Sequence, residues 1–241
     1  RHLEALQELQ LAQEESEQYD GRLLLARVFS SIGDIYRILG ASREAMSFYL
    51  RSLSLEQGRG SLLGQAMLRD KIALSRLAQG KPNDALTDAK ESLELRQQIN
   101  DVVGQARSHT VIGMILQRLE RYGEAAEELQ QALTLEEQIQ NPRGQGIALL
   151  HLGNASRAQR KFELARSCYT RAVAVTRRDN DQLGLTRALT YSGDLAYEEG
   201  RREQANTYWV EALKIRDALH HADEAAELRE RIRSGHIPRR N

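Results

Sequence analysis

Long apolar runs, cysteines, prolines and aromatic residues are all scarce in this sequence of 241 residues. No run of about 18 apolar residues predicts a membrane-spanning helix, and no charged-then-apolar start suggests a secretory signal. The single cysteine, Cys168, cannot form an internal disulfide, which favours a reducing, cytoplasmic location. Three prolines and few aromatics among many Ala, Leu, Glu, Gln and Arg disfavour a sheet and predict an all-α protein.

An excess of one charge is also missing. The 34 basic and 34 acidic side chains give a formal charge of zero, so the whole molecule gives no reason to expect a nucleic-acid partner or an anionic membrane. Arginines do gather near the C-terminus, where they could contact phosphates, but glutamates are interleaved with them and favour a solvated end helix. These arginines are Arg229, Arg231, Arg233, Arg239 and Arg240.

What the sequence does contain is a pattern that recurs every 40 residues. Small residues mark the two clearest columns: Gly33, Ala73, Gly113, Gly153 and Gly193 in one, and Ala45, Ala85, Ala125, Ala165 and Ala205 in the other. A fixed period of this size is typical of a solenoid of stacked helix pairs. We predict five units, at 21–60, 61–100, 101–140, 141–180 and 181–220. A second helix of a partial repeat is expected at 1–20, a capping helix at 221–233 and a basic tail at 234–241.

Local signals predict where the helices of each unit begin and end. Gly40 suits the C′ position of a first helix, and Ser42 is expected to be the N-cap of the second. Pro82 suits a first helical turn, where its missing N–H would be unpaired anyway. Cap-type side chains are expected at the joins between units, from Asn100, Asp101, Asn180 and Asp181.

Small residues also recur seven positions apart, hence on one helical face two turns away. Ala26, Ala66 and Ala106 precede the Gly33 column by seven residues, and the Ala45 column precedes Ser52, Ser92, Ala132, Ala172 and Ala212 by seven. Small residues at both positions let the two helix axes approach closely. These columns are therefore predicted to be packing contacts.

The columns resemble the tetratricopeptide repeat (TPR) motif of a large residue, Leu-Gly, Tyr, Ala, an aromatic and Ala. The best matches are Phe29, Ile32-Gly33, Tyr36, Ala45, Tyr49 and Ser52, and then Leu149, Leu152-Gly153, Ala165, Tyr169 and Ala172. The 40-residue period and the string at 151–155 are similar to the Pins and LGN polarity scaffolds, whose long repeats also occur in bacterial regulators. This resemblance implies a right-handed α-solenoid and a groove lined by one face of the first helices.

Positions 7, 10, 14 and 17 of each first helix are polar or mixed and fall within about 80° of one another. The resemblance implies that this face binds a protein or peptide partner, and its apolar centre and arginines predict a partner with apolar and acidic residues. The candidate partner-binding residues are Arg27, Asp34, Arg37, Met67, Asp70, Leu74, Arg107, Thr110, Met114, Gln117, Ile147, Leu150, Asn154, Arg157, Arg187, Asp194 and Tyr197. Asn154 is expected to hold a ligand backbone through both its amide donor and its acceptor.

Two alternatives stay open for this face and for the chain. The arginines could instead pair with Asp34, Asp70 and Asp194 of neighbouring helices while the apolar residues pack on the next unit. The chain could also be a sensor or regulatory arm of a larger signalling protein that docks within its own polypeptide. An open first helix would allow chains to self-associate.

No constellation of residues predicts catalysis, a metal or a cofactor. His109 and His151 lie 42 residues apart without a cysteine or carboxylate at metal-ligand spacing, so a packing role is favoured for both. Cys168 is expected to be a buried, inert thiol. Each glycine recurs with the repeat, which leaves no phosphate-binding loop. The sequence therefore predicts a non-catalytic interaction scaffold.

Overall fold

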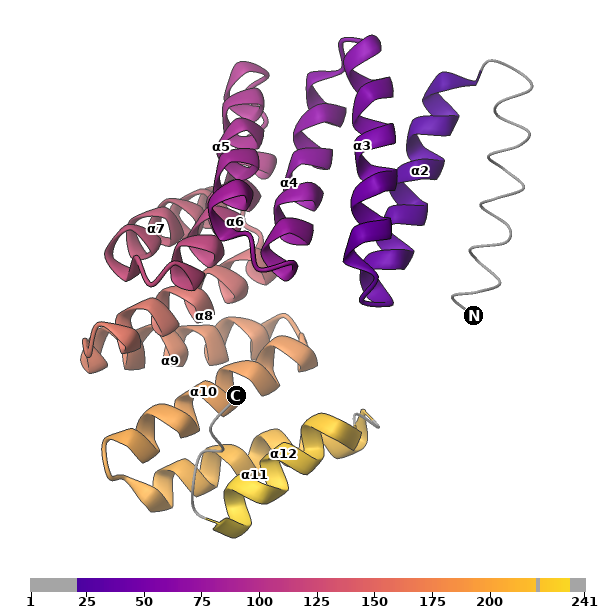
Figure 1. Ribbon diagram of the computed structural model, residues 1–241. Helices are drawn as coiled ribbons and strands as arrows, with labels where there is room; N and C mark the ends of the chain where they lie inside the picture. Colours follow the sequence, from indigo (N-terminus) through magenta and orange to yellow (C-terminus); the bar gives the residue numbers. More distant parts are fainter. Residues whose placement is uncertain (1–20, 220–221, 235–241) are drawn as a thin grey trace. The chain divides into compact units, whose positions relative to one another are not determined.

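The computed structural model describes residues 21–219 and 222–234, and all regular structure in these ranges is α-helical. The helices are α2 (Arg22–Ile38), α3 (Ser42–Gly58), α4 (Leu62–Ala78), α5 (Pro82–Gln98), α6 (Val102–Arg118), α7 (Tyr122–Gln138), α8 (Pro142–Ala158), α9 (Phe162–Arg178), α10 (Gln182–Glu198), α11 (Arg202–Ala218) and α12 (Ala222–Ser234) (Figure 1). The prediction of an all-α protein is confirmed. The predicted partial repeat at 1–20 and the tail beyond Ser234 lie outside the described residues.

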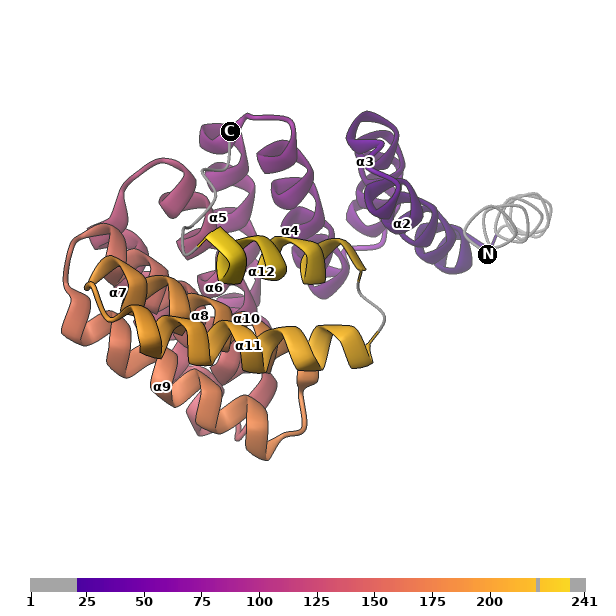
Figure 2. The same ribbon diagram turned by 90° about the horizontal axis from the view of Figure 1, so that it is seen from below.

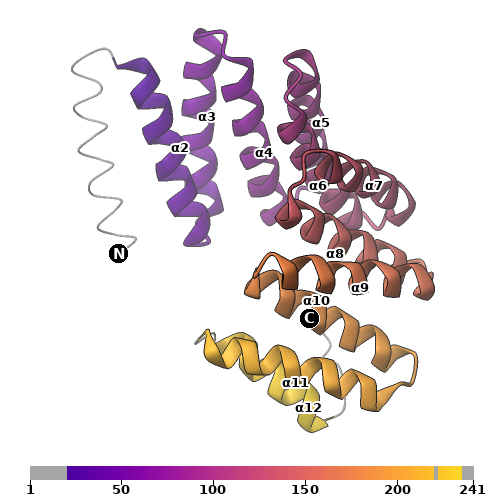
Figure 3. The same cartoon turned by 180° about the vertical axis from the view of Figure 1, so that it is seen from behind.

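The chain forms two compact units, residues 1–120 with α2–α6 and residues 121–241 with α7–α12. Within each unit, helices that follow one another in the sequence pack side by side. Figure 3 shows this for α2, α3 and α4 in the first unit and for α8 to α11 in the second. First helices begin at 22, 62, 102, 142 and 182, so helix starts repeat at the step of the sequence pattern.

The same hydrogen-bonded turn ends α2 to α5 and α7 to α10. After α2, the N–H of Gly40 donates to the carbonyl of Arg37 at 3.1 Å and the N–H of Ala41 donates to Tyr36 at 2.9 Å, which together form a Schellman motif. Gly40 has a φ of 77°, so the predicted C′ role of Gly40 is confirmed. Asn100 and Asn180 occupy the equivalent place with φ of 54° and 56°. They therefore cap the preceding helices at the joins between units, through the left-handed backbone conformation that ends a helix.

The N-terminal caps agree with the sequence at some joins and differ at others. The side chains of Asp101 and Asp181 each accept an N–H bond at 2.9 Å from the glycine three residues later, as predicted. Pro82 is the first residue of α5, also as predicted. Ser42, however, is the first helical residue of α3, and Ala41 occupies the N-cap without a side-chain bond. The tight turn after Gly40 brings the helix start one residue earlier than the Ser42 cap requires.

The small-residue columns are packing contacts. Ala26, Ala66 and Ala106 and the whole Ala45 column are at most 1% exposed. The hydroxyl of Ser52 donates to the carbonyl of Ala26 at 2.7 Å, and Ser92 does the same to Ala66 at 2.8 Å. Each bond ties the second helix of a pair to the first, at the same register in both pairs.

The glycine column is explained by aromatic rings on the second helices. A Cβ at Gly33 would lie 2.5 Å from the ring of Tyr49, and one at Gly153 would lie 2.4 Å from the ring of Tyr169. Both rings are almost completely buried. In the pair at 61–100 the ring position is Ala89, and there the column holds Ala73, which is also fully buried. A ring on the second helix is therefore matched with glycine in each of the three pairs that have one, whereas Gly113 accompanies Leu129 in the pair at 101–140.

The core of the second unit ends on α12. Leu228 of α12 is buried in one cluster with Leu185 and Leu189 of α10 and Trp209 of α11. Figure 2 shows α12 lying beside α11. The side chains of Glu227, Arg229 and Glu230 are exposed on α12, so its other face is polar. Its role as an end cap stays a prediction.

Candidate functional site

We define the first-helix face as positions 7, 10, 14 and 17 of each first helix, taken separately in the two units. In the first unit its residues are Arg27, Ser30, Asp34, Arg37, Met67, Asp70, Leu74, Leu77, Arg107, Thr110, Met114 and Gln117. In the second unit they are Ile147, Leu150, Asn154, Arg157, Arg187, Thr190, Asp194 and Tyr197. Position 7 is exposed in every first helix, with Met67 at 43% and Ile147 at 38%.

Hydrogen bonds between first helices show that this face is continuous within the first unit. The ammonium of Lys71 on α4 donates to Ser30 Oγ and Asp34 Oδ2 on α2, both at 2.7 Å. The hydroxyl of Ser108 on α6 donates to Asp70 Oδ1 on α4 at 3.3 Å. The polar positions of α2, α4 and α6 therefore lie next to one another.

The charge on the first unit's face is positive. Its first helices α2, α4 and α6 contain only two carboxylates, Asp34 and Asp70. Asp34 is paired with Lys71 at 2.7 Å, and Asp70 is paired with Arg96 at 2.7 Å. Within the described ranges, no carboxylate forms an ion pair with the three arginines of this face, which are Arg27, Arg37 and Arg107. Arg27, Arg37 and Arg107 are exposed, and Arg37 interacts with the hydroxyl of Tyr49.

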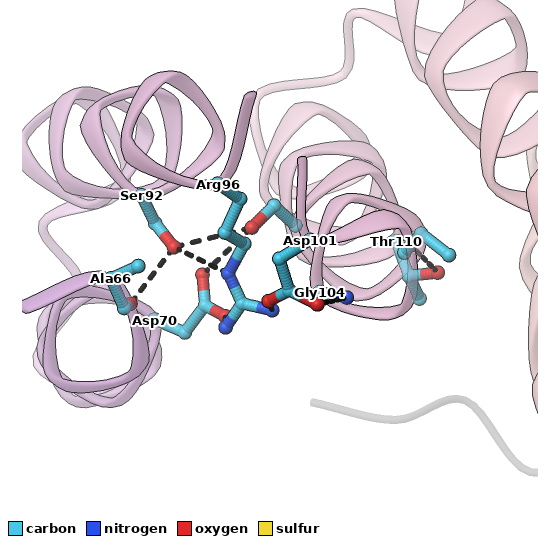
Figure 4. Close-up of polar contacts among 9 residues, drawn as sticks. Ala66, Asp70, Ser92, Arg96, Asp101, Gly104 and Thr110 are labelled. Carbon is cyan, nitrogen blue, oxygen red and sulfur yellow. Dashed lines mark hydrogen bonds and ion pairs between the residues drawn. The ribbon is translucent and has the colours of Figure 1, made fainter. Parts of the chain in front are cut away.

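Asp70 lies beneath this face, in a buried polar network with α5 and α6 (Figure 4). Arg96, only 2% exposed, donates to Asp70 and also lies 3.5 Å from Asp101. Ser92 Oγ accepts a hydrogen bond from Arg96 at 3.3 Å and donates one to the carbonyl of Ala66. Burial raises the pKa of Asp70, and the neighbouring Arg96 opposes that rise. The network joins three helices from inside, so Asp70 supports the face instead of lining it.

In the second unit, aromatic donors on the second helices fix the polar residue at position 14. Tyr169 donates its hydroxyl to Asn154 Oδ1 at 2.6 Å, and Trp209 donates its indole N–H to Asp194 at 3.1 Å. Burial raises the pKa of Tyr169, so the phenol stays protonated and remains a donor. Asn154 Oδ1 is thus occupied, which leaves its amide N–H groups for a ligand. The first unit repeats the arrangement with Tyr49 and Asp34, at 2.8 Å.

Arg157 already has a partner in the second unit. Its guanidinium donates two bonds to Glu198 of α10, at 3.0 and 2.9 Å. Asn154, Arg157, Ala158 and Glu198 line an open depression of about 420 Å³. A ligand carboxylate at Arg157 would therefore compete with Glu198.

Two further candidate residues are buried in the second unit. Leu150 is 5% exposed and Asp194 is 4% exposed, and Arg231 of α12 lies 3.7 Å from the Asp194 carboxylate. Burial raises the pKa of Asp194, against the effect of Arg231. Tyr197 packs its ring 5.8 Å from that of Trp209. Asp194 and Tyr197 hold α10 against α11 and α12, whereas Ile147 and Arg187 are exposed.

Position 3 of the first helices was missed by the sequence reasoning. Leu23, Leu63 and Val103 occupy it in the first unit and are 52%, 49% and 55% exposed, and Leu183 is 40% exposed in the second. At 100° per residue, position 3 falls within the angular range of positions 7, 10, 14 and 17. The recurrence of a large apolar residue at position 3 was therefore a usable signal in the sequence. Lys71 and Glu198 were also missed, because contacts between helices are not encoded in the spacing along one helix.

The described residues contain no group of three His, Cys, Asp or Glu side chains that could hold a metal ion. Cys168 is buried, and burial raises its pKa and so disfavours the reactive thiolate. Burial and the nearby Arg187 lower the pKa of His151 to about 4, which keeps that imidazole neutral. None of the described helices is long and apolar enough to cross a bilayer.

Comparison with known families identifies the repeats. Residues 26–58 and residues 64–138 each match a family model described as tetratricopeptide repeat. The chain therefore contains tetratricopeptide repeats, as the sequence motif predicted. No curated protein sequence matches the chain.

Solved structures of low sequence identity share the fold. BtubC (BKLC) from P. vanneervenii superimposes with a TM-score of 0.78 at 17% identity, over 91% of this chain and 92% of that one. A Rap protein complexed with competence and sporulation factor gives 0.71 at 17%, over 97% and 70%. The STAND protein PH0952 from Pyrococcus horikoshii, which has a tetratricopeptide repeat sensor, gives 0.72 at 16%, over 85% of this chain and 32% of its own. At these identities the likeness establishes the fold alone.

Proposed function

We propose that this chain is a non-catalytic protein-interaction scaffold that captures a segment of a protein partner on its first-helix face. One observation carries the proposal: exposed apolar residues of α4 lie beside exposed arginines of α2 and α6 that have no carboxylate partner in the described ranges. Exposed apolar groups of this kind mark interaction sites in soluble proteins. Free guanidinium groups beside them favour a ligand with carboxylates.

The candidate residues divide into two roles in this proposal. Exposed and half-buried side chains would touch the ligand of each unit taken separately: Met67 as apolar anchor and Arg107 as donor to a carboxylate in the first unit, and Ile147 and Arg187 in the same two roles in the second. Asn154 would hold a ligand backbone in the second unit, donating its amide N–H and accepting with the lone pair that Tyr169 does not use. Buried residues would support the face from below. These are Asp70, Leu150 and Asp194.

The comparisons support this proposal without identifying a partner. One similar structure is a Rap protein in complex with competence and sporulation factor, so this fold accommodates a bound factor in that protein. The step of 40 between helix starts supports a similarity to the long repeats of the Pins and LGN scaffolds. A cytoplasmic location is part of the same proposal and is favoured by the single cysteine.

A display selection tests the proposal. Random peptides displayed on phage would be selected on the immobilised chain, and the enriched pool would be assayed on two variants. We expect Arg107→Glu to lose the pool and the control Arg43→Glu, an exposed arginine of α3, to retain it. If no peptide is enriched, or if both variants bind the pool equally well, the first-helix face is not the binding surface.

A regulatory arm of a larger signalling protein is the second candidate. It is favoured by the likeness to PH0952, whose repeats are a sensor and of which this chain would span about a third. The segment captured on the first-helix face would then belong to the same polypeptide. The sequence of the complete gene product distinguishes the two, since an ATPase, protease or DNA-binding domain in it would support the arm.

A further inference from the structure

Helix α4 presents one apolar stripe along its whole length. The stripe consists of Leu63, Met67, Leu74 and Leu77, which fall within about 80° of one another around the helix. Leu63 and Met67 are 49% and 43% exposed, and Leu74 and Leu77 are half-buried. From the first to the last residue the stripe covers about 21 Å of helix axis, at 1.5 Å per residue. Four turns of one helix therefore show apolar side chains to solvent.

Cations lie on both sides of this stripe. Arg27 and Arg37 lie on α2, about 15 Å apart along its axis, and Arg107 lies on α6. Between α2 and α4, Lys71 and Asp34 form an ion pair, so their charges cancel. The stripe is thus apolar along its length and positively charged at its flanks.

This arrangement distinguishes between two shapes of ligand. An extended segment that crosses α2, α4 and α6 at one level would meet one residue of the stripe, and one laid along α4 would place unpaired backbone N–H and C=O groups against apolar side chains. A ligand helix parallel to α4 would cover all four residues, because its own apolar residues at i, i+4, i+11 and i+14 have the same rise. Acidic residues on the two edges of that helix would meet Arg27 and Arg37 on one side and Arg107 on the other.

We infer that the first unit binds an amphipathic helix of a partner protein, about 14 residues long. The apolar face of this ligand helix lies along α4, and both of its edges carry carboxylates. The inference rests on the proposed function and adds the ligand's conformation, orientation and charge. The carboxylates supply steering and register, since charge-assisted bonds to arginine are strong and directional. The four apolar contacts supply the area that excludes water.

Two displayed libraries test this inference together with the proposed function. One library presents randomised faces on a helical peptide, and the other presents random peptides with a proline at every fourth position, which cannot form a helix. Enrichment of helical peptides with apolar residues at three- and four-residue spacing and acidic edges is the expected result. Enrichment from the proline library alone would overturn the helix and keep the proposed function. Enrichment from neither library would overturn both.

Variants then locate the bound helix on the chain. Met67→Glu should weaken the enriched helical peptide at least about tenfold, as for a central contact residue. Leu50→Glu is the matched control, because Leu50 is similarly exposed at 47% on α3 of the same unit. Circular dichroism confirms that both variants fold. Equal losses in the two variants, or no loss in either, would overturn the assignment to α4.

Discussion

A methyl group added at Gly153 tests the match between the glycine column and the aromatic rings. In Gly153→Ala the new Cβ would lie 2.4 Å from Tyr169 Cε1 and 2.7 Å from Cδ1. The ring is 1% exposed, so it has no free space to move into. Any shift of the ring also disturbs its 2.6 Å hydrogen bond to Asn154. The substitution therefore creates a steric overlap with the Tyr169 ring that the wild-type protein does not have.

The expected size of the effect follows from three contributions. Overpacking costs about 1–3 kcal/mol, and loss of the Tyr169 hydrogen bond costs about 1 kcal/mol. The higher helix propensity of alanine returns about 1 kcal/mol. The net loss in the free energy of unfolding is about 1–3 kcal/mol, which lowers the Tm by about 2–12 °C in a chain of this size.

Thermal unfolding of five proteins provides the assay: the wild type, Gly153→Ala, Gly123→Ala, Tyr169→Ala and the double variant. Gly123→Ala is the control, because no atom lies within 4 Å of its new Cβ, and it should match or exceed the wild-type Tm. In a Tyr169→Ala background, Gly153→Ala should be neutral or stabilising, as the natural pair of Ala73 and Ala89 indicates. If Gly153→Ala raises the wild-type Tm as much as Gly123→Ala does, the ring does not determine the glycine.

Three further predictions concern stability. Asp70→Ala should cost about 1.5–3 kcal/mol in denaturant unfolding, because the buried Arg96 guanidinium loses its 2.7 Å bond to Asp70 and keeps Asp101 as its remaining carboxylate, at 3.5 Å; a loss below about 1 kcal/mol would contradict the network. His151 has its folded pKa lowered to about 4 from 6.5, so stability is retained above pH 6.5 and lost as the pH falls toward 4, by up to about 3 kcal/mol. The variant His151→Gln should show a shallower decline over that range, and an unchanged slope would show that this imidazole contributes nothing. Ala125→Leu should lower the Tm, because overpacking at this fully buried site costs about 1–3 kcal/mol in the free energy of unfolding. An unchanged Tm would refute the packing role of Ala125.

The fold was predictable because the small residues that pack the two helices of a pair recur every 40 residues in the sequence. The alanine column of Ala45 and Ala125 marks buried contacts wherever it recurs. The conformation of Gly40 also followed from local chemistry. Ser42 was misassigned because the Schellman turn after Gly40 makes it the first helical residue of α3. Asn100 and Asn180 lie at the joins as predicted, but the sequence did not tell which helix end each caps, because cap-type side chains suit both ends.

The candidate face was only partly predictable. Met67, Arg27 and Arg107 are exposed, which their helical positions indicated. Asp70 shares the same angular range but is drawn beneath the face by Arg96 of α5, a partner that no pattern within one helix could reveal. Leu63 was overlooked although its spacing was visible, because position 3 was not included in the stripe.

Photo-crosslinking gives the most direct test of the first-helix face as the binding surface. A benzophenone side chain would replace Met67 in one protein and Leu50 in another, and each would be irradiated with the selected peptide. We expect a covalent adduct at position 67 and none at position 50, since only Met67 lies on the apolar stripe of α4. An adduct at position 50 with none at position 67 would place the peptide elsewhere and contradict the account.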